Sequence, residues 1–149
     1  MKKLFLDIEG TLIDDLSNPL FLASNIDKIR KLIPLYDEIS IFSFAIYDSS
    51  DKELYKSTLD ALLKELKTTN VEFLYKNDLL PVFKEHFGNN LSLIDFNCDI
   101  CISKELAFYL YSKTISDKYE KITLIDDRVS TQVILFNSCM VKMININEM

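Results

Sequence analysis

Two acidic side chains, Asp7 and Glu9, follow a short apolar run in the segment LFLDIEGTLIDD, which begins at Leu4. On an extended segment, residues two positions apart point to the same side, so both carboxylates face the same place. A strand and a turn need only the apolar run, and neither requires the paired carboxylates. Asp7 and Glu9 are therefore the first candidates for a site that grips a ligand.

Polar side chains also follow two other apolar runs of the chain. Asp126 and Asp127 end the run KITLIDD, Ser43 follows EISIF, and Lys104 stands at the start of a helical segment. In open parallel sheets, ligands bind beyond the carboxyl ends of the strands, where the strand order reverses. If these strands are neighbours, the side chains meet at one edge of the sheet.

Crowded carboxylates repel one another unless a cation lies among them, and hard oxygen ligands suit Mg²⁺. The hydroxyl of Ser43 and the ammonium of Lys104 are the kind of donors that a phosphate needs for its oxygens. The sequence therefore predicts a magnesium site beside a phosphate site.

The elements that must position these residues alternate between strand and helix. We expect strands at 4–6, 38–47, 71–75, 121–127 and 139–146, and helices at 18–36, 49–67, 77–88, 103–115 and 130–137. Ser50 with Glu53 predicts a capping box, Asn77 and Ser130 are expected to open helices, and Gly88 is expected to end one.

This alternation predicts an α/β fold of three layers, Rossmann-like, with a parallel sheet covered by helices on both faces. No repeat, linker or low-complexity tract interrupts the pattern, so residues 1–149 are expected to form a single domain.

The composition narrows the classes of partner. Seventeen Lys and Arg against 23 Asp and Glu give a net charge of −6, which disfavours nucleic acid as a partner. The apolar runs are too short to span a membrane, and the start of the chain is not typical of a signal sequence. Three cysteines do not indicate a disulfide framework, so a cytoplasmic protein is expected.

The order of these motifs resembles the haloacid dehalogenase superfamily of aspartate-dependent phosphohydrolases. The resemblance rests on DIEGTL, Ser43, Lys104 and LIDDR, and it extends from Leu4 to about Ile144. It implies that Asp7 attacks phosphorus and becomes an aspartyl phosphate. It also implies that Glu9 protonates the leaving oxygen and later activates water.

The resemblance further implies a phosphate site and a Mg²⁺ site. The phosphate site would comprise Ser43, Lys104, Gly10 and Thr11, and the metal site Asp7, the carbonyl of Glu9, Asp126 and, through water, Asp127. The expected activity is hydrolysis of a phosphomonoester, carried by a small molecule or by a macromolecule.

The chain departs from most of these phosphatases, which have aspartate at the position of Glu9, although the enolase-phosphatase branch is similar in reading DIEGT. That branch carries a cap domain. Here the gap between Thr11 and Ile39 holds about one helix, and 76–103 only a small insert, so no large cap is expected. By analogy with the family, an uncapped site goes with larger substrates or with a lid from a partner subunit, and a homodimer stays open.

Alternatives remain at several positions. Lys76 competes with Lys104 for the phosphate site, since it directly follows the third expected strand. Cys98 and Cys101 form a single CxxC, which provides too few ligands for structural zinc. His86 is expected at the surface of an amphipathic helix, and the aromatic residues of LAFYLY are expected in the core or in a subunit contact.

A second class of function is a catalytically weak or inactive relative that binds a phosphorylated ligand or a protein partner. Response-regulator receivers are also small acidic domains, but they carry their acidic pair at the first strand, whereas the pair here ends a late strand. Dehalogenation is disfavoured, because that reaction would not use the carboxylates expected to bind the metal.

Overall fold

The computed structural model describes residues 1–88 and 103–149. Within these ranges, six strands form one sheet in the order β3-β2-β1-β4-β6-β5. The strands are β1 (Lys2–Leu6), β2 (Glu38–Phe42), β3 (Glu72–Leu74), β4 (Lys121–Asp126), β5 (Gln132–Phe136) and β6 (Cys139–Asn145). The apolar runs of the sequence therefore form the sheet, as expected.

The strand order reverses beside β1. The chain runs outward from β1 to β2 and β3, and then returns to the other side of β1 as β4. Both neighbours of β1 are parallel to it, with Leu6 opposite Ile41 on one side and opposite Ile125 on the other. The carboxyl ends of β1 and β4 therefore flank the switch point at which α/β sheets bind ligands.

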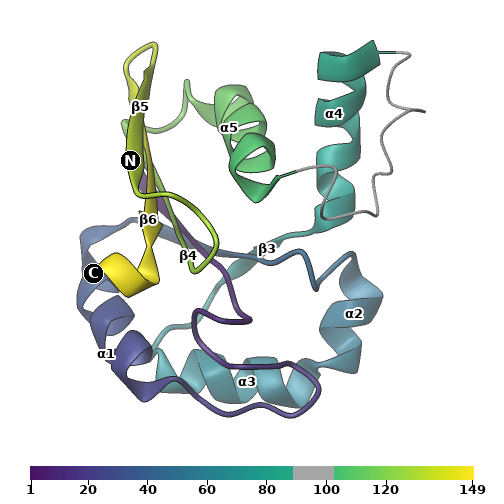
Figure 1. Cartoon of the computed structure of the whole chain (residues 1–149), viewed down its shortest axis with the longest axis vertical. Helices are drawn as coiled ribbons and strands as arrows, with labels where there is room; N and C mark the ends of the chain where they lie inside the picture. The colour runs from purple at the N-terminus through teal and green to yellow at the C-terminus, as the bar shows by residue number, and fades with distance from the viewer. Residues whose placement is uncertain (89–102) are drawn as a thin grey trace.

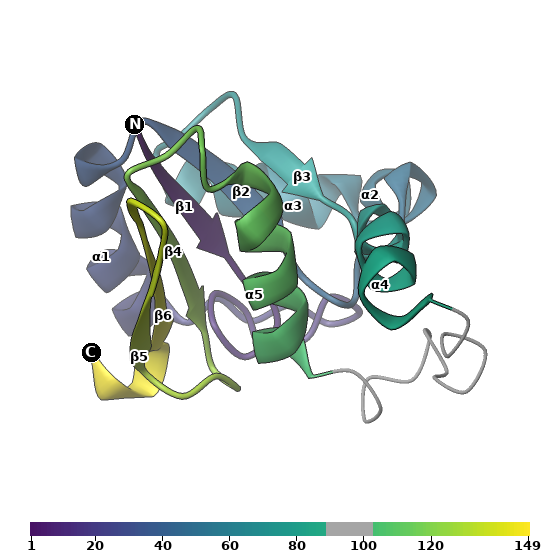
Figure 2. The same ribbon diagram turned by 90° about the horizontal axis from the view of Figure 1, so that it is seen from above.

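Helices cover both faces of the sheet (Figures 1 and 2). The helices α1 (Ala23–Leu32) and α3 (Lys56–Glu65) pack on one face, and α4 (Leu80–Phe87) and α5 (Lys104–Ile115) on the other. The short helix α2 (Ser49–Leu54) precedes α3, and 3₁₀ turns occupy Ile33–Leu35, Lys76–Leu79 and Ile146–Glu148. The fold is thus a three-layer α/β arrangement compatible with the Rossmann-like class.

The expectation of a helix at 130–137 is wrong. These residues form β5, which pairs antiparallel with β6 through a two-residue turn at Asn137 and Ser138. The segment QVILF is rich in β-branched residues, which favour strands, and Asn137 takes φ 53°, a conformation that asparagine tolerates in hairpin turns. The sheet is therefore mostly, but not wholly, parallel.

Several helix boundaries also differ from those expected. The first helix begins at Ala23, because Phe21 still pairs with Ile13 as an isolated bridge. The expected strand 38–47 ends at Phe42, and the expected helix 49–67 is divided at Tyr55.

The caps differ as well. Asp48, and not Ser50, caps α2, since its carboxylate accepts from the backbone N–H groups of Ser50 and Asp51. Asn77 lies inside a 3₁₀ turn capped by Tyr75, whereas Gly88 ends α4 as predicted.

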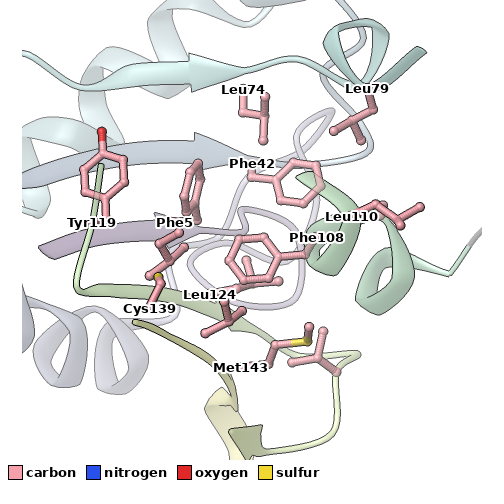
Figure 3. Packing of buried hydrophobic residues seen from close by; sticks show 14 of the residues in the cluster. Phe5, Phe42, Leu74, Leu79, Phe108, Leu110, Tyr119, Leu124, Cys139 and Met143 are labelled. Carbon is pink, nitrogen blue, oxygen red and sulfur yellow. The ribbon is translucent and has the colours of Figure 1, made fainter. Parts of the chain in front are cut away.

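Three large aromatic side chains of the core, Phe5, Phe42 and Phe108, lie between α5 and the sheet (Figure 3). Phe108 of α5 is fully buried and contacts Phe5 of β1 and Phe42 of β2, with ring centroids 5.4 and 6.2 Å away. Burying rings of this size contributes much of the stability of a domain. The packing also holds the start of α5 beside the ends of β1 and β2, and it confirms that the LAFYLY segment belongs to the core.

Among the described residues, no helix is long and apolar enough to cross a membrane.

Candidate active site

A cavity of about 500 Å³ opens at the carboxyl edge of the sheet. Among the described residues it is lined by Asp7, Glu9, Ser43, Phe44, Ala45, Tyr47, Ser103, Lys104, Glu105, Asp126, Asp127 and Arg128. Six of the eight residues predicted for the site thus line a single cavity, at the expected switch point.

A buried ammonium joins two of the predicted carboxylates. Lys104 Nζ lies 2.6 Å from Asp7 Oδ1 and 2.5 Å from Asp126 Oδ2. Lys104 is the first residue of α5, whose N-terminus is capped by the Ser103 hydroxyl accepting from the Leu106 N–H. Helix α5 therefore delivers the ammonium to the ends of β1 and β4.

Asp7 is held at each of its carboxylate oxygens. Its Oδ2 accepts a hydrogen bond of 3.0 Å from the Thr11 hydroxyl, and its backbone N–H donates to the carbonyl of Ile125. Thr11 is fully buried and orients the Asp7 side chain. Its predicted contact with phosphate stays a prediction.

Burial dominates the electrostatics of Asp7. Desolvation raises its pKa to about 6, the ammonium of Lys104 opposes that rise, and the charges of Asp126 and Asp127 add to it. Desolvation lowers the pKa of Lys104, but the charges of Asp7 and Asp126 outweigh this effect, so its pKa is raised and the ammonium stays charged. A cation in the cavity is therefore favoured as a further partner for Asp7.

Three carboxylates form a cluster that could hold a metal ion. Asp7, Asp126 and Asp127 each offer an oxygen, and these atoms lie within 4.8 Å of one another. Asp127 Oδ1 is buried without a hydrogen-bond partner in the described part of the chain, a costly state for a carboxylate oxygen. The donor set is all oxygen, which suits a hard divalent cation such as Mg²⁺.

Gly10 allows Asp127 to approach the first loop. It has φ +81°, and a Cβ placed on it would lie 2.2 Å from Asp127 Oδ2. Neither the backbone conformation nor the space suits a larger residue. Gly10 therefore shapes the carboxylate cluster through its backbone.

Glu9 lines the cavity but also belongs to the loop that follows β1. Its Oε2 accepts a hydrogen bond of 3.0 Å from the backbone N–H of Leu16. The Glu9 side chain is not part of the carboxylate cluster, which is consistent with the expectation that only its carbonyl faces a metal.

Ser43 directly follows β2 and is 2% exposed. Its Oγ accepts a hydrogen bond of 3.2 Å from the Ala45 N–H, which leaves its own hydrogen free to serve as a donor. The nearby hydroxyls of Ser49 and Ser50 lie in the first turn of α2, and these residues do not line the cavity.

The two candidate lysines occupy different places. Lys104 lines the cavity, whereas Lys76 is buried with its ammonium 4.9 Å from the ring centroids of both Phe44 and Tyr47. The geometry thus favours Lys104 for a phosphate. His86 is exposed, as predicted, and Cys98 and Cys101 lie outside the described residues.

The sequence analysis did not identify Phe44, Tyr47, Glu105 and Arg128 as lining residues. Arg128 directly follows the second acidic pair, so its position was a usable signal. Tyr47 lies five residues beyond the end of β2, and sequence pattern does not indicate that its loop turns back to the cavity.

Comparisons with known proteins return no match: no protein-family model, no curated protein and no solved structure is similar to this chain.

Proposed function

We propose that this protein is a Mg²⁺-dependent phosphohydrolase of the haloacid dehalogenase type, which works through an aspartyl phosphate on Asp7. The observation that carries the proposal is the convergence of Asp7, Lys104 and Asp126. Asp7 directly follows β1, Lys104 begins α5 and Asp126 ends β4, and the ammonium of Lys104 lies within 2.6 Å of both carboxylates. A structural ion pair alone does not account for the unpartnered oxygen of Asp127 beside it.

In the first step, a carboxylate oxygen of Asp7 attacks phosphorus and the bond from phosphorus to the leaving oxygen breaks. The carboxyl group of Glu9 gives its proton to that oxygen, so the leaving group departs as a neutral alcohol. Lys104 and the Ser43 hydroxyl stabilise the negative charge that spreads over the phosphoryl oxygens.

In the second step, Glu9 takes a proton from water as the water oxygen attacks phosphorus. The bond between phosphorus and Asp7 breaks, inorganic phosphate leaves, and the Asp7 carboxylate is restored. Because one carboxyl group serves as acid and then as base, each turnover returns Glu9 to its starting state.

Asp7, the carbonyl of Glu9, Asp126 and Asp127 would hold the Mg²⁺. The ion supplies positive charge that offsets the charge of the phosphoryl oxygens when it is bound. The all-oxygen cluster and the free Asp127 oxygen support this assignment.

The test begins with a panel of phosphorylated metabolites and nucleotides, assayed with Mg²⁺ for wild type and Asp7→Asn. Wild type is expected to release phosphate and Asp7→Asn to release none above background. Exposed Asp117→Asn is the matched control and is expected to retain activity. Equal release by wild type and Asp7→Asn would show that Asp7 is not the nucleophile.

A trapping experiment tests the intermediate directly. With p-nitrophenyl phosphate, whose leaving group needs little protonation, Glu9→Gln is expected to form the aspartyl phosphate but to hydrolyse it slowly. Acid-quenched Glu9→Gln should then carry one phosphoryl group by mass spectrometry, and Asp7→Asn should carry none.

The second candidate is a protein that binds a phosphorylated ligand without hydrolysing it. The bond from Leu16 N–H to Glu9 favours this reading, since it engages the acid–base carboxylate in the loop. Mg²⁺-dependent binding of a phosphate ester without phosphate release would support it.

A further inference from the structure

Most charged side chains that line the cavity already have partners. Lys104 is paired with Asp7 and Asp126, and Glu9 accepts from Leu16 N–H. Glu105 also has two partners: its Oε1 accepts from the Ser130 N–H at 2.7 Å, and its Oε2 accepts from the side-chain amide of Gln132 at 3.3 Å. Among the lining residues that the structure describes, and apart from the Asp127 oxygen assigned to the metal cluster, one charged group remains, the guanidinium of Arg128.

The backbone of Arg128 is fixed while its side chain is free. Its N–H donates a hydrogen bond of 2.8 Å to Asp126 Oδ1, which ties it to the carboxylate cluster. The side chain is exposed at the cavity, and its guanidinium makes no hydrogen bond or ion pair within the described ranges, not even with the adjacent Asp127. An arginine stays protonated at all physiological pH values, so this guanidinium carries a permanent positive charge.

The charge of the cavity makes this cation significant. Five of its described lining residues are acidic, so an anionic group on the substrate in addition to the phosphate would be repelled unless a cation lies nearby. Lys104 is engaged by two carboxylates, which leaves Arg128 for that role. The cavity volume of about 500 Å³ also exceeds what a phosphoryl group alone needs.

We infer that Arg128 is a specificity residue that binds a second anionic group, a carboxylate or a phosphate, on the leaving group of the substrate. The planar guanidinium can donate two parallel hydrogen bonds to such a group. The inference rests on the proposed function, and it narrows the substrate class to phosphate monoesters whose leaving group carries a second anionic group.

The test compares esters that differ in that charge. Ethyl phosphate is paired with phosphoglycolate, and glycerol 3-phosphate with 3-phosphoglycerate; the bisphosphate of ethylene glycol replaces the carboxylate by a second phosphate. Wild type is expected to prefer the esters that carry a carboxylate or a second phosphate besides the scissile phosphate. Arg128→Ala should raise their KM about 10- to 100-fold and leave the KM of ethyl phosphate and all kcat values nearly unchanged.

Two further variants serve as controls for this test. Arg128→Lys retains the charge but loses the paired hydrogen bonds, so its KM should lie between those of wild type and Arg128→Ala. Lys118→Ala removes an exposed cation that does not line the cavity and should match wild type. Preference for the carboxylates or for the bisphosphate identifies which anion is bound.

The outcomes separate the two proposals. Hydrolysis of all esters without preference, or an equal loss for every ester in Arg128→Ala and Arg128→Lys, would overturn the role of Arg128 and leave the proposed function standing. If wild type hydrolyses members of the metabolite and nucleotide panel but none of these esters, the role of Arg128 is overturned alone; failure on the panel as well as on these esters would overturn both.

Discussion

At the scale of single residues, the site is built by burying charge. Asp7 is 5% exposed, and Lys104 and Thr11 hold its two oxygens. Ionising such a buried carboxylate costs free energy, because the charge is removed from water. The contacts with Lys104 and Thr11 keep the carboxylate oriented. Protein stability should therefore respond to the ionisation of this one group.

We predict that metal-free Asp7→Asn is more stable than wild type at pH 7.5. Burial raises the folded pKa of Asp7 to about 6, above its ordinary value of 3.8, so the protonated form is the favoured one in the fold. The stability that it contributes is fully present below pH 3.8 and is lost as pH rises through 6. Asparagine does not titrate, so the gain at pH 7.5 should be of the order of 2 kcal/mol.

Urea unfolding in EDTA between pH 4 and 7.5 measures this effect. The difference between Asp7→Asn and wild type should shrink toward pH 4, while Asp117→Asn should track wild type throughout. A constant difference across this range would mean that the ionisation of Asp7 is not its cause.

Gly10→Ala provides a second test at this scale. The added Cβ would meet Asp127 Oδ2 at 2.2 Å on a backbone with φ +81°. We expect a loss of about 1 to 3 kcal/mol in the free energy of unfolding, together with weaker Mg²⁺ binding by calorimetry. Gly88→Ala is the matched control, since Gly88 also has positive φ but has open space around it. A loss of stability without a change in Mg²⁺ affinity would show that the crowding does not reach the metal cluster.

At the scale of elements, the sequence predicts the strands well where they are apolar runs that end in polar residues. This pattern also predicted the meeting of Asp7, Ser43 and Asp126, because strand ends in a parallel sheet share one edge. The segment 130–137 was misread because Ser130 resembles a helix cap and the run QVILF is too short to show a period. The contact of Glu9 with Leu16 was beyond prediction, since it depends on how a loop folds back.

The hairpin between β5 and β6 gives a test of its own. Asn137 occupies the first central position of the turn at φ 53°. We expect Asn137→Val to lower the free energy of unfolding by about 1 to 2 kcal/mol, because a β-branched residue is strained there. Asn137→Gly should match wild type or exceed it by up to about 1 kcal/mol. Thermal unfolding of wild type and the two variants measures these differences. Equal melting temperatures for Asn137→Val and Asn137→Gly would contradict the turn geometry.

At the scale of the whole molecule, one sheet separates two hydrophobic clusters. Leu4 and Leu6 of β1 face the cluster with α1 and α3, and Phe5 faces the cluster with α4 and α5. The alternation of side chains along β1 therefore links both halves of the core. The central strand that links both clusters also leads directly into Asp7.

We predict that Phe108→Ala costs about 3 to 5 kcal/mol in the free energy of unfolding, because it leaves a cavity among the rings of Phe5 and Phe42. Leu54→Ala, at a side chain that is 72% exposed, should cost less than about 0.5 kcal/mol. Chemical denaturation followed by circular dichroism measures both. A loss of stability below about 1 kcal/mol for Phe108→Ala would show that the side chains around Phe108 repack to fill the cavity.

The pairing of β1 with β4 also sets the order of events when the chain folds. β1 begins at Lys2 and β4 begins at Lys121, so their contact closes a long loop, which is entropically costly and slow. Asp7 and Asp126 come together only when that loop has closed. The proposed Mg²⁺ site should therefore form only after this loop has closed, so that Mg²⁺ binding during refolding would report a late stage of folding.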